Sequence, residues 1–127
     1  MDSRELLDEM PEMQIAKSKI DSIGKAYDKE LKQLQDRYEI AYKEGDDDEA
    51  QRIQLRLYTF KDAVDSEIEA KSEALFSPIR YKVSRAIHDV ALEGGYDMVL
   101  DSRYDAIVLY ASKKSDMTEA VKKKLGL

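Results

Sequence analysis

The chain has 127 residues, the size of one domain, and no cysteine, which excludes a disulfide scaffold. Charged residues make up 38% of the sequence, with only five glycines and two prolines, so the composition favours long helices over an all-β sandwich. Lysine and arginine total 21 against 27 aspartates and glutamates, a net charge of −6. This acidic excess argues against nucleic acid as a partner, because phosphate binding requires clustered basic side chains.

The first predicted element is an amphipathic helix over residues 4–43, where apolar side chains recur at steps of three and four. A polar block, 44–49, follows and contains Gly45. A glycine at a helix end and carboxylates in the next first turn predict a helix stop, a tight turn and a second helix. The four consecutive carboxylates at 46–49 lack the spaced ligands of a calcium loop, so they predict no metal site.

The second apolar run covers residues 53–90 and repeats every eleven positions, as in Ile53 and Val64. A period of about 3.67 residues per turn predicts nearly straight or slightly right-handed helices. Folding the chain at Asp47–Asp48 places apolar residues of the two runs opposite one another, which predicts an antiparallel helical hairpin. The expected pairs include Leu31 with Val64, Tyr38 with Leu57, and Tyr42 with Ile53. Pro78 interrupts the second run, so we expect a kink or break at 76–78.

The carboxyl-terminal part is expected to form a small body. Gly94 and Gly95 end the preceding helix, and two short β-branched runs, 96–101 and 106–111, flank a turn at 102–105. This pattern predicts a β-hairpin, followed by a capped helix from Met117 to Leu125. Because two strands alone are marginally stable, we expect other subunits to complete the body.

The predicted fold class is therefore mainly α with a small β-body. An antiparallel helical-hairpin arm occupies residues 1–76, with its turn near 45–49, and the body occupies residues 77–127. The sequence leaves open whether the first residues of the arm belong to the body.

No catalytic constellation is visible in the sequence, so we do not expect an enzyme, a cofactor or a metal. Nucleophilic catalysis would depend on the single histidine, His88, without a nucleophile motif near it. We interpret His88 as an ordinary helix residue. No stretch approaches the roughly 20 apolar residues of a membrane span, and no secretory signal follows Met1.

Three motifs resemble successive landmarks of one known family. They are Leu6–Glu12 (LLDEMPE), Gly95–Asp101 (GYDMVLD) and Asp116–Val121 (DMTEAV), with Pro78 as a further landmark. The chain resembles the Skp/OmpH family of outer-membrane-protein chaperones over its whole length, and the segment 96–101 is the most specific part.

The resemblance implies a homotrimer in the periplasm. Each subunit would contribute strands to a central β-body and extend one helical tentacle, and unfolded outer-membrane proteins would be held between the tentacles without ATP. We expect any export signal to have been removed. Members of the family usually open with a strand before the position of Asp2, so we expect that strand to be lost, trimmed or replaced here.

Two sets of residues follow as candidate sites. Five apolar residues outside the predicted seam either contact clients or widen the apolar stripe: Ile15, Ile40, Leu55, Tyr58 and Phe76. Six residues of the predicted strands are expected to form the oligomerisation body: Met98, Val99, Leu100, Ile107, Val108 and Leu109. The hypothesis is an ATP-independent holdase of unfolded outer-membrane proteins, and the alternative is a coiled-coil scaffold or adaptor.

Overall fold

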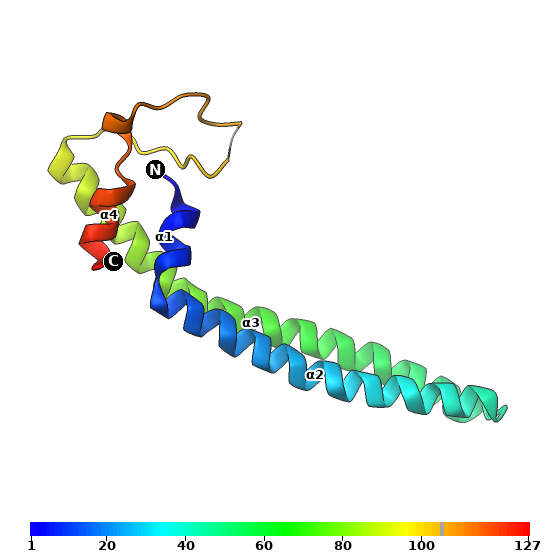
Figure 1. Ribbon diagram of the computed structural model, residues 1–127. Helices are drawn as coiled ribbons and strands as arrows, with labels where there is room; N and C mark the ends of the chain where they lie inside the picture. The colour runs from blue at the N-terminus through cyan, green and yellow to red at the C-terminus, as the bar shows by residue number, and fades with distance from the viewer. Residues whose placement is uncertain (105) are drawn as a thin grey trace. The chain divides into compact units, whose positions relative to one another are not determined.

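The computed structural model describes residues 1–104 and 106–127. Its elements are the helices α1 (Ser3–Glu9), α2 (Pro11–Lys43), α3 (Asp47–Gly94) and α4 (Thr118–Leu125), with a short 3-10 helix, η1 (Lys113–Ser115), before the last (Figure 1). Contacts divide the chain into two compact units. The body unit comprises Met1–Ala16 and Leu75–Leu127, and the arm unit comprises Lys17–Ala74.

The first predicted helix is divided in two. Asp2 caps α1 by accepting hydrogen bonds from the backbone N–H groups of Arg4 and Glu5. Met10 ends α1 in an extended conformation (φ −76°, ψ 120°), because the proline that follows disfavours helical geometry at the residue before it. Pro11 then begins α2, where its missing N–H costs nothing.

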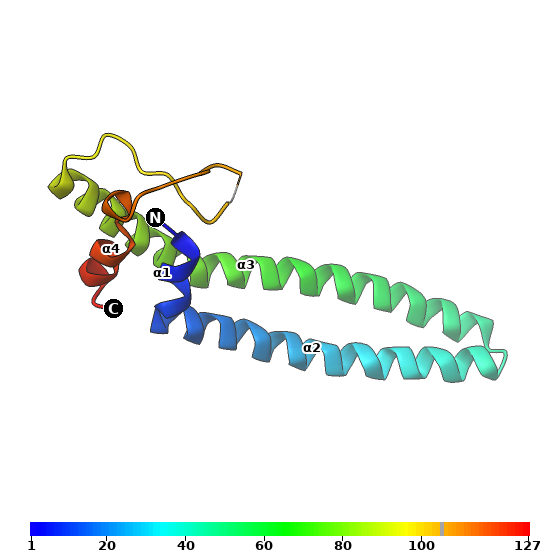
Figure 2. The ribbon, with the colours of Figure 1, turned by 45° about the horizontal axis from the view of Figure 1, so that its top comes forward.

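The arm unit is an antiparallel pair of helices, formed by the α2 and α3 segments that run side by side (Figure 2). The tight turn is confirmed: Gly45 adopts φ 72°, and Asp46 Oδ1 accepts a hydrogen bond from Glu49 N at 3.2 Å. Beside the turn, Ala41, Ala50 and Ile53 form a small buried cluster against which Tyr38 and Leu57 pack.

One predicted pair is wrong. Tyr42 is 69% exposed and does not face Ile53; the small Ala41 takes the buried place next to Ile53. The Tyr42 ring instead stacks on Tyr38, with centroids 6.2 Å apart. The tight turn brings the two helices close together at this end, so alanine fits the seam and a tyrosine does not.

The body unit has a closed hydrophobic core, and Leu6, Met10 and Val121 are its most deeply buried members. They come from α1, the residue that follows α1, and α4, so these short helices are held by packing rather than by their own propensity. The other buried members are Met13, Ala16, Ile79, Val83, Ala86, Val90 and Met117.

Pro78 does not break the second long helix. Helix α3 continues through it from Asp47 to Gly94, and Pro78 itself is exposed. Buried residues such as Ile79 and Val83 hold the helix on the carboxyl side of the proline. This packing offsets the hydrogen bond that a proline removes from a helix.

The predicted β-hairpin is wrong for the single chain, because none of the described residues forms a strand. Segments 96–101 and 106–111 are irregular, and Asp105 of the predicted turn lies outside the described residues. Strands need partners for their N–H and C=O groups, and an isolated pair is marginal. Among the described residues, Met1 is the neighbour that comes from a distant part of the chain: Met1 O accepts from Ser102 N at 2.7 Å, and the Met1 ammonium donates to Leu100 O at 3.4 Å.

Candidate functional site

The irregular segment between α3 and η1 carries many exposed apolar side chains. Tyr96, Met98 and Leu100 alternate along it and are exposed, whereas Val99 between them packs against the body core. This spacing of two is that of an extended chain. We call the exposed members the 96–110 surface: Tyr96, Met98, Leu100, Tyr104, Ile107, Leu109 and Tyr110.

Hydrogen bonds fasten this segment to the start of α1. The Asp101 carboxylate accepts from Ser3 N at 3.1 Å, from Ser3 Oγ at 2.5 Å and from Arg103 N at 3.1 Å. Burial raises the pKa of Asp101, but these hydrogen bonds together outweigh burial and hold the pKa below its usual value. The segment is therefore anchored at Asp101 while the apolar side chains on either side remain exposed.

An apolar cavity of about 440 Å³ lies beneath the segment. Met1, Met98 and Met117 contribute to its lining, together with three serines. The remaining lining is Tyr96, Val99, Leu100, Val108, Tyr110 and Ala111. Such a hollow beside exposed apolar side chains can receive an apolar group from outside, and flexible thioether side chains adapt to different shapes.

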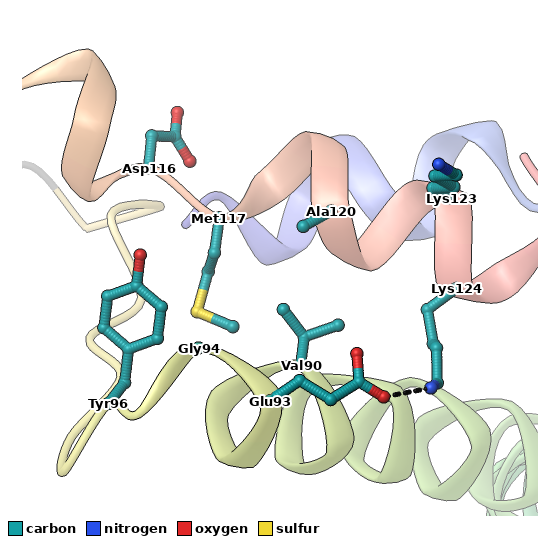
Figure 3. Close-up of a pocket in the computed structure, with 9 residues that line it drawn as sticks. All are labelled: Val90, Glu93, Gly94, Tyr96, Asp116, Met117, Ala120, Lys123 and Lys124. Carbon is teal, nitrogen blue, oxygen red and sulfur yellow. Dashed lines mark hydrogen bonds and ion pairs between the residues drawn. The ribbon is translucent and has the colours of Figure 1, made fainter.

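A second hollow, of about 610 Å³, opens beside Tyr96 (Figure 3). Figure 3 shows Val90 and Met117 directed toward one another from α3 and from the start of α4, with the Tyr96 ring at one end. Lys124 Nζ pairs with Glu93 at 2.5 Å at the other end. A Cβ on Gly94 would lie 2.5 Å from a ring carbon of Tyr96, so only glycine permits this placement of the ring.

The helices that support the surface are held together by one lysine. Lys122 Nζ lies 2.5 Å from Glu5, 2.8 Å from Glu9 and 3.3 Å from Glu119, which joins α4 to α1. Hydrogen bonds to Glu5 and Glu9 raise the pKa of Lys122, against the smaller opposing effect of burial. Asp116 supports the same helix by accepting from Thr118 N at 3.0 Å and from Thr118 Oγ1 at 2.6 Å, and these bonds lower its pKa.

A family model described as "Outer membrane protein (OmpH-like)" matches residues 1–125, nearly the whole chain. The chain belongs to the OmpH-like family. No curated protein matches it. Membership of this family implies a chaperone role in the periplasm and no enzymatic activity. The resemblance read from the sequence is thereby confirmed.

The arm unit of the OmpH-like chain carries three of the five predicted client-contact residues. Ile40, Leu55 and Tyr58 are all exposed there. In the body unit, Ile15 is also exposed, whereas Phe76 is half-buried and packs against the core. The structure therefore leaves four of the five side chains open to contact, without showing what contacts them.

The six residues expected to mediate oligomerisation fall into two groups. Met98, Leu100, Ile107 and Leu109 are exposed, and Leu109 is 93% exposed. Val99 and Val108 are half-buried, and Val99 packs against the core. Three tyrosines of the same surface, Tyr96, Tyr104 and Tyr110, were not among the predicted residues. The alternation of Tyr96 with Met98 and Leu100 was the signal that could have included the first of them.

The described part of the chain offers no support for histidine-based catalysis, for metal binding or for a membrane-spanning helix. His88 is exposed on α3, and its Nδ1 lies 3.8 Å from Asp89. Within residues 1–104 and 106–127, no group of three or more histidines, cysteines or carboxylates is placed to hold a metal ion. None of the helices described there is long and apolar enough to cross a membrane.

Proposed function

We propose that this OmpH-like chain is an ATP-independent holdase, in which three copies associate through the 96–110 surface and hold unfolded outer-membrane proteins in the periplasm. The observation that carries the proposal is the set of seven large apolar side chains exposed in one segment of the body unit. Large exposed apolar groups mark interaction sites in soluble chains. In this proposal residues 77–127 associate, and residues 1–76 contact clients.

The unformed hairpin supports association. Segments 96–101 and 106–111 have the β-branched and aromatic composition of strands but no ladder in the single chain. Pairing with the same segments of other copies would satisfy their backbone groups and cover their side chains. Asp101, tied to Ser3, holds one end of the segment in place for that pairing.

The arm supports client holding. A holdase needs many weak contacts, so that clients leave again, and the exposed Ile40, Leu55 and Tyr58 provide such contacts without a fixed pocket. The surrounding carboxylates keep the arm itself in solution. The client-contact residues in this proposal are those named from the sequence, with Phe76 contributing only its exposed part.

Light scattering after size exclusion tests the first half of the proposal. We expect the mass of three chains, and we expect Leu109→Asp to shift the chain toward the monomer, because a charge would be covered at the interface. Leu92→Asp is the matched control, since Leu92 is also exposed but lies on α3 outside the surface. Equal loss of assembly in both variants would contradict the assignment of the surface.

Suppression of aggregation of an unfolded β-barrel protein tests the second half. We expect the wild-type trimer to suppress it, and Leu55→Ser with Tyr58→Ser to weaken suppression while the trimer persists. Gln51→Ser with Gln54→Ser, polar positions on the same helix, is the control. A trimer that leaves aggregation unchanged would instead support the alternative, a coiled-coil scaffold or adaptor.

A further inference from the structure

The methionines of the chain are divided sharply by exposure. All five lie in the body unit, and the structure describes all of them. Met10, Met13 and Met117 are core residues with exposures of 1%, 6% and 5%, whereas Met98 is 73% exposed. Oxidation of a thioether follows its exposure, so one sulfur of this chain is far more open to oxidants than these three.

The exposed thioether stands in the surface proposed for association. Met98 lies between the exposed Tyr96 and Leu100, and it also lines the 440 Å³ apolar cavity with Met1 and Met117. The side-chain hydroxyls among the residues that line this cavity are those of three serines and two tyrosines, and the hydroxyls of Ser112 and Ser115 already bond to each other at 3.1 Å. A new polar oxygen on Met98 would thus enter a setting that is apolar apart from these hydroxyl groups.

We propose that Met98 is an oxidation site that controls assembly, in which the sulfoxide disfavours association of the chains. The oxidant is a peroxide. The Met98 Sδ atom gives up two electrons and gains one oxygen atom as the O–O bond of hydrogen peroxide breaks, and the other peroxide oxygen leaves as water. The product replaces a flexible apolar side chain by a polar one.

Assembly and oxidation then oppose each other. In the trimer, Met98 is covered and protected; in the dissociated chain, it is open to peroxide, and the sulfoxide keeps the chain dissociated, since covering an uncompensated polar group is unfavourable. The core methionines are unaffected, so the fold of the body unit survives the modification. This inference rests on the proposed association through the 96–110 surface.

Peroxide treatment followed by peptide mass spectrometry tests the site. At a chain concentration below that of half-assembly, we expect Met98 sulfoxide to form at least about tenfold faster than the sulfoxide of Met10, Met13 or Met117. Raising the concentration above half-assembly should slow oxidation of Met98 and leave the other three unchanged. Equal rates for the four residues, or a Met98 rate that does not depend on concentration, would overturn the proposal.

Light scattering of the oxidised chain tests the consequence. We expect oxidation to raise the concentration of half-assembly by about tenfold, the effect of burying one uncompensated polar group. Met98→Leu should assemble normally and resist peroxide, and Met98→Gln should assemble poorly without it. Loss of assembly in peroxide-treated Met98→Leu would overturn the proposal.

The two proposals fail in different ways. If the untreated chain does not associate, the trimer itself is refuted. If the untreated chain associates but oxidation at Met98 leaves assembly unchanged, only the control by oxidation is refuted.

Discussion

The body unit and the arm unit reach their folds by different means. In the body unit, three short or terminal segments bury Leu6, Met10 and Val121 almost completely. In the arm unit, much of the seam is only half-buried, and one layer is polar: Tyr27 donates to Glu67, which also pairs with Lys71 at 2.6 Å. Stability is therefore concentrated in the core of the body, whereas the arm depends on helix formation and a thin seam.

The contrast between the two units predicts that the largest loss of stability follows from a substitution in the body core. Leu6→Ala should lower the free energy of unfolding by about 2–5 kcal/mol, because it leaves a cavity in a closed core. Leu57→Ala, in the half-buried seam of the arm unit, should lower the free energy of unfolding by clearly less than Leu6→Ala does. Urea denaturation followed by circular dichroism measures both, and equal losses would remove the distinction between the units.

The second largest effect on stability is expected from replacing Lys122, which joins α4 to α1. Lys122→Met removes three carboxylate contacts, so it should lower the melting temperature more than Lys123→Met, since Lys123 is an exposed neighbour on the same helix. The partner carboxylates are partly exposed, so salt should reduce the difference. If the two variants melted alike at low salt, Lys122 would not contribute to holding α4.

Acid should weaken the body through two carboxylates. The pKa values of Asp101 and Asp116 are lowered in the fold, from an ordinary value of 3.8. Their stabilising effect is therefore complete above about pH 4 and is lost as pH falls from there toward their folded pKa values. Thermal melting between pH 2 and 6 should show a smaller acid loss in Asp101→Asn with Asp116→Asn than in wild type. An unchanged pH profile would contradict this assignment.

The smallest expected effect is a gain in stability from a substitution in the arm unit. Gly24 lies within α2, and a Cβ there would meet nothing within 4 Å, so Gly24→Ala should stabilise the chain by about 0.5–1 kcal/mol through the unfolded state. Gly45→Ala is the opposing control, because Gly45 needs φ 72° in the turn and alanine is strained there. Denaturant midpoints of the two variants should move in opposite directions.

The sequence predicted the helices better than the strands, for a physical reason. The hairpin of α2 and α3 could be predicted because a helix forms its backbone hydrogen bonds within itself, and the period of its apolar residues indicates which face is buried. The turn at Gly45 could be predicted from local chemistry alone. The break at Met10 could also have been predicted, because Met10 precedes Pro11. It was not predicted, because the apolar period continues past Met10 and indicates one uninterrupted helix.

The β-hairpin predicted from the sequence was wrong, because a strand depends on a neighbour as well as on its own composition. Tyr96–Asp101 has strand composition, but among the described residues its backbone hydrogen bonds are made only with Ala91, near the end of α3, and with Met1. Lys122 was missed for a related reason: its partners Glu5 and Glu9 come from a distant helix, and no local pattern links them. The exposed apolar residues of the arm were recognised because they fall outside the helical seam.

The ion pair of Lys122 with Glu5 joins residues 117 positions apart in the chain. A polypeptide that emerges from its amino end can wind the arm hairpin as soon as residue 74 is available, since those contacts are local. It cannot close the core around Leu6 until Val121 and Lys122 arrive, because closing so long a loop must await its far end. The surface between residues 96 and 110 is therefore organised last, so the association proposed for it would wait until the chain is nearly complete.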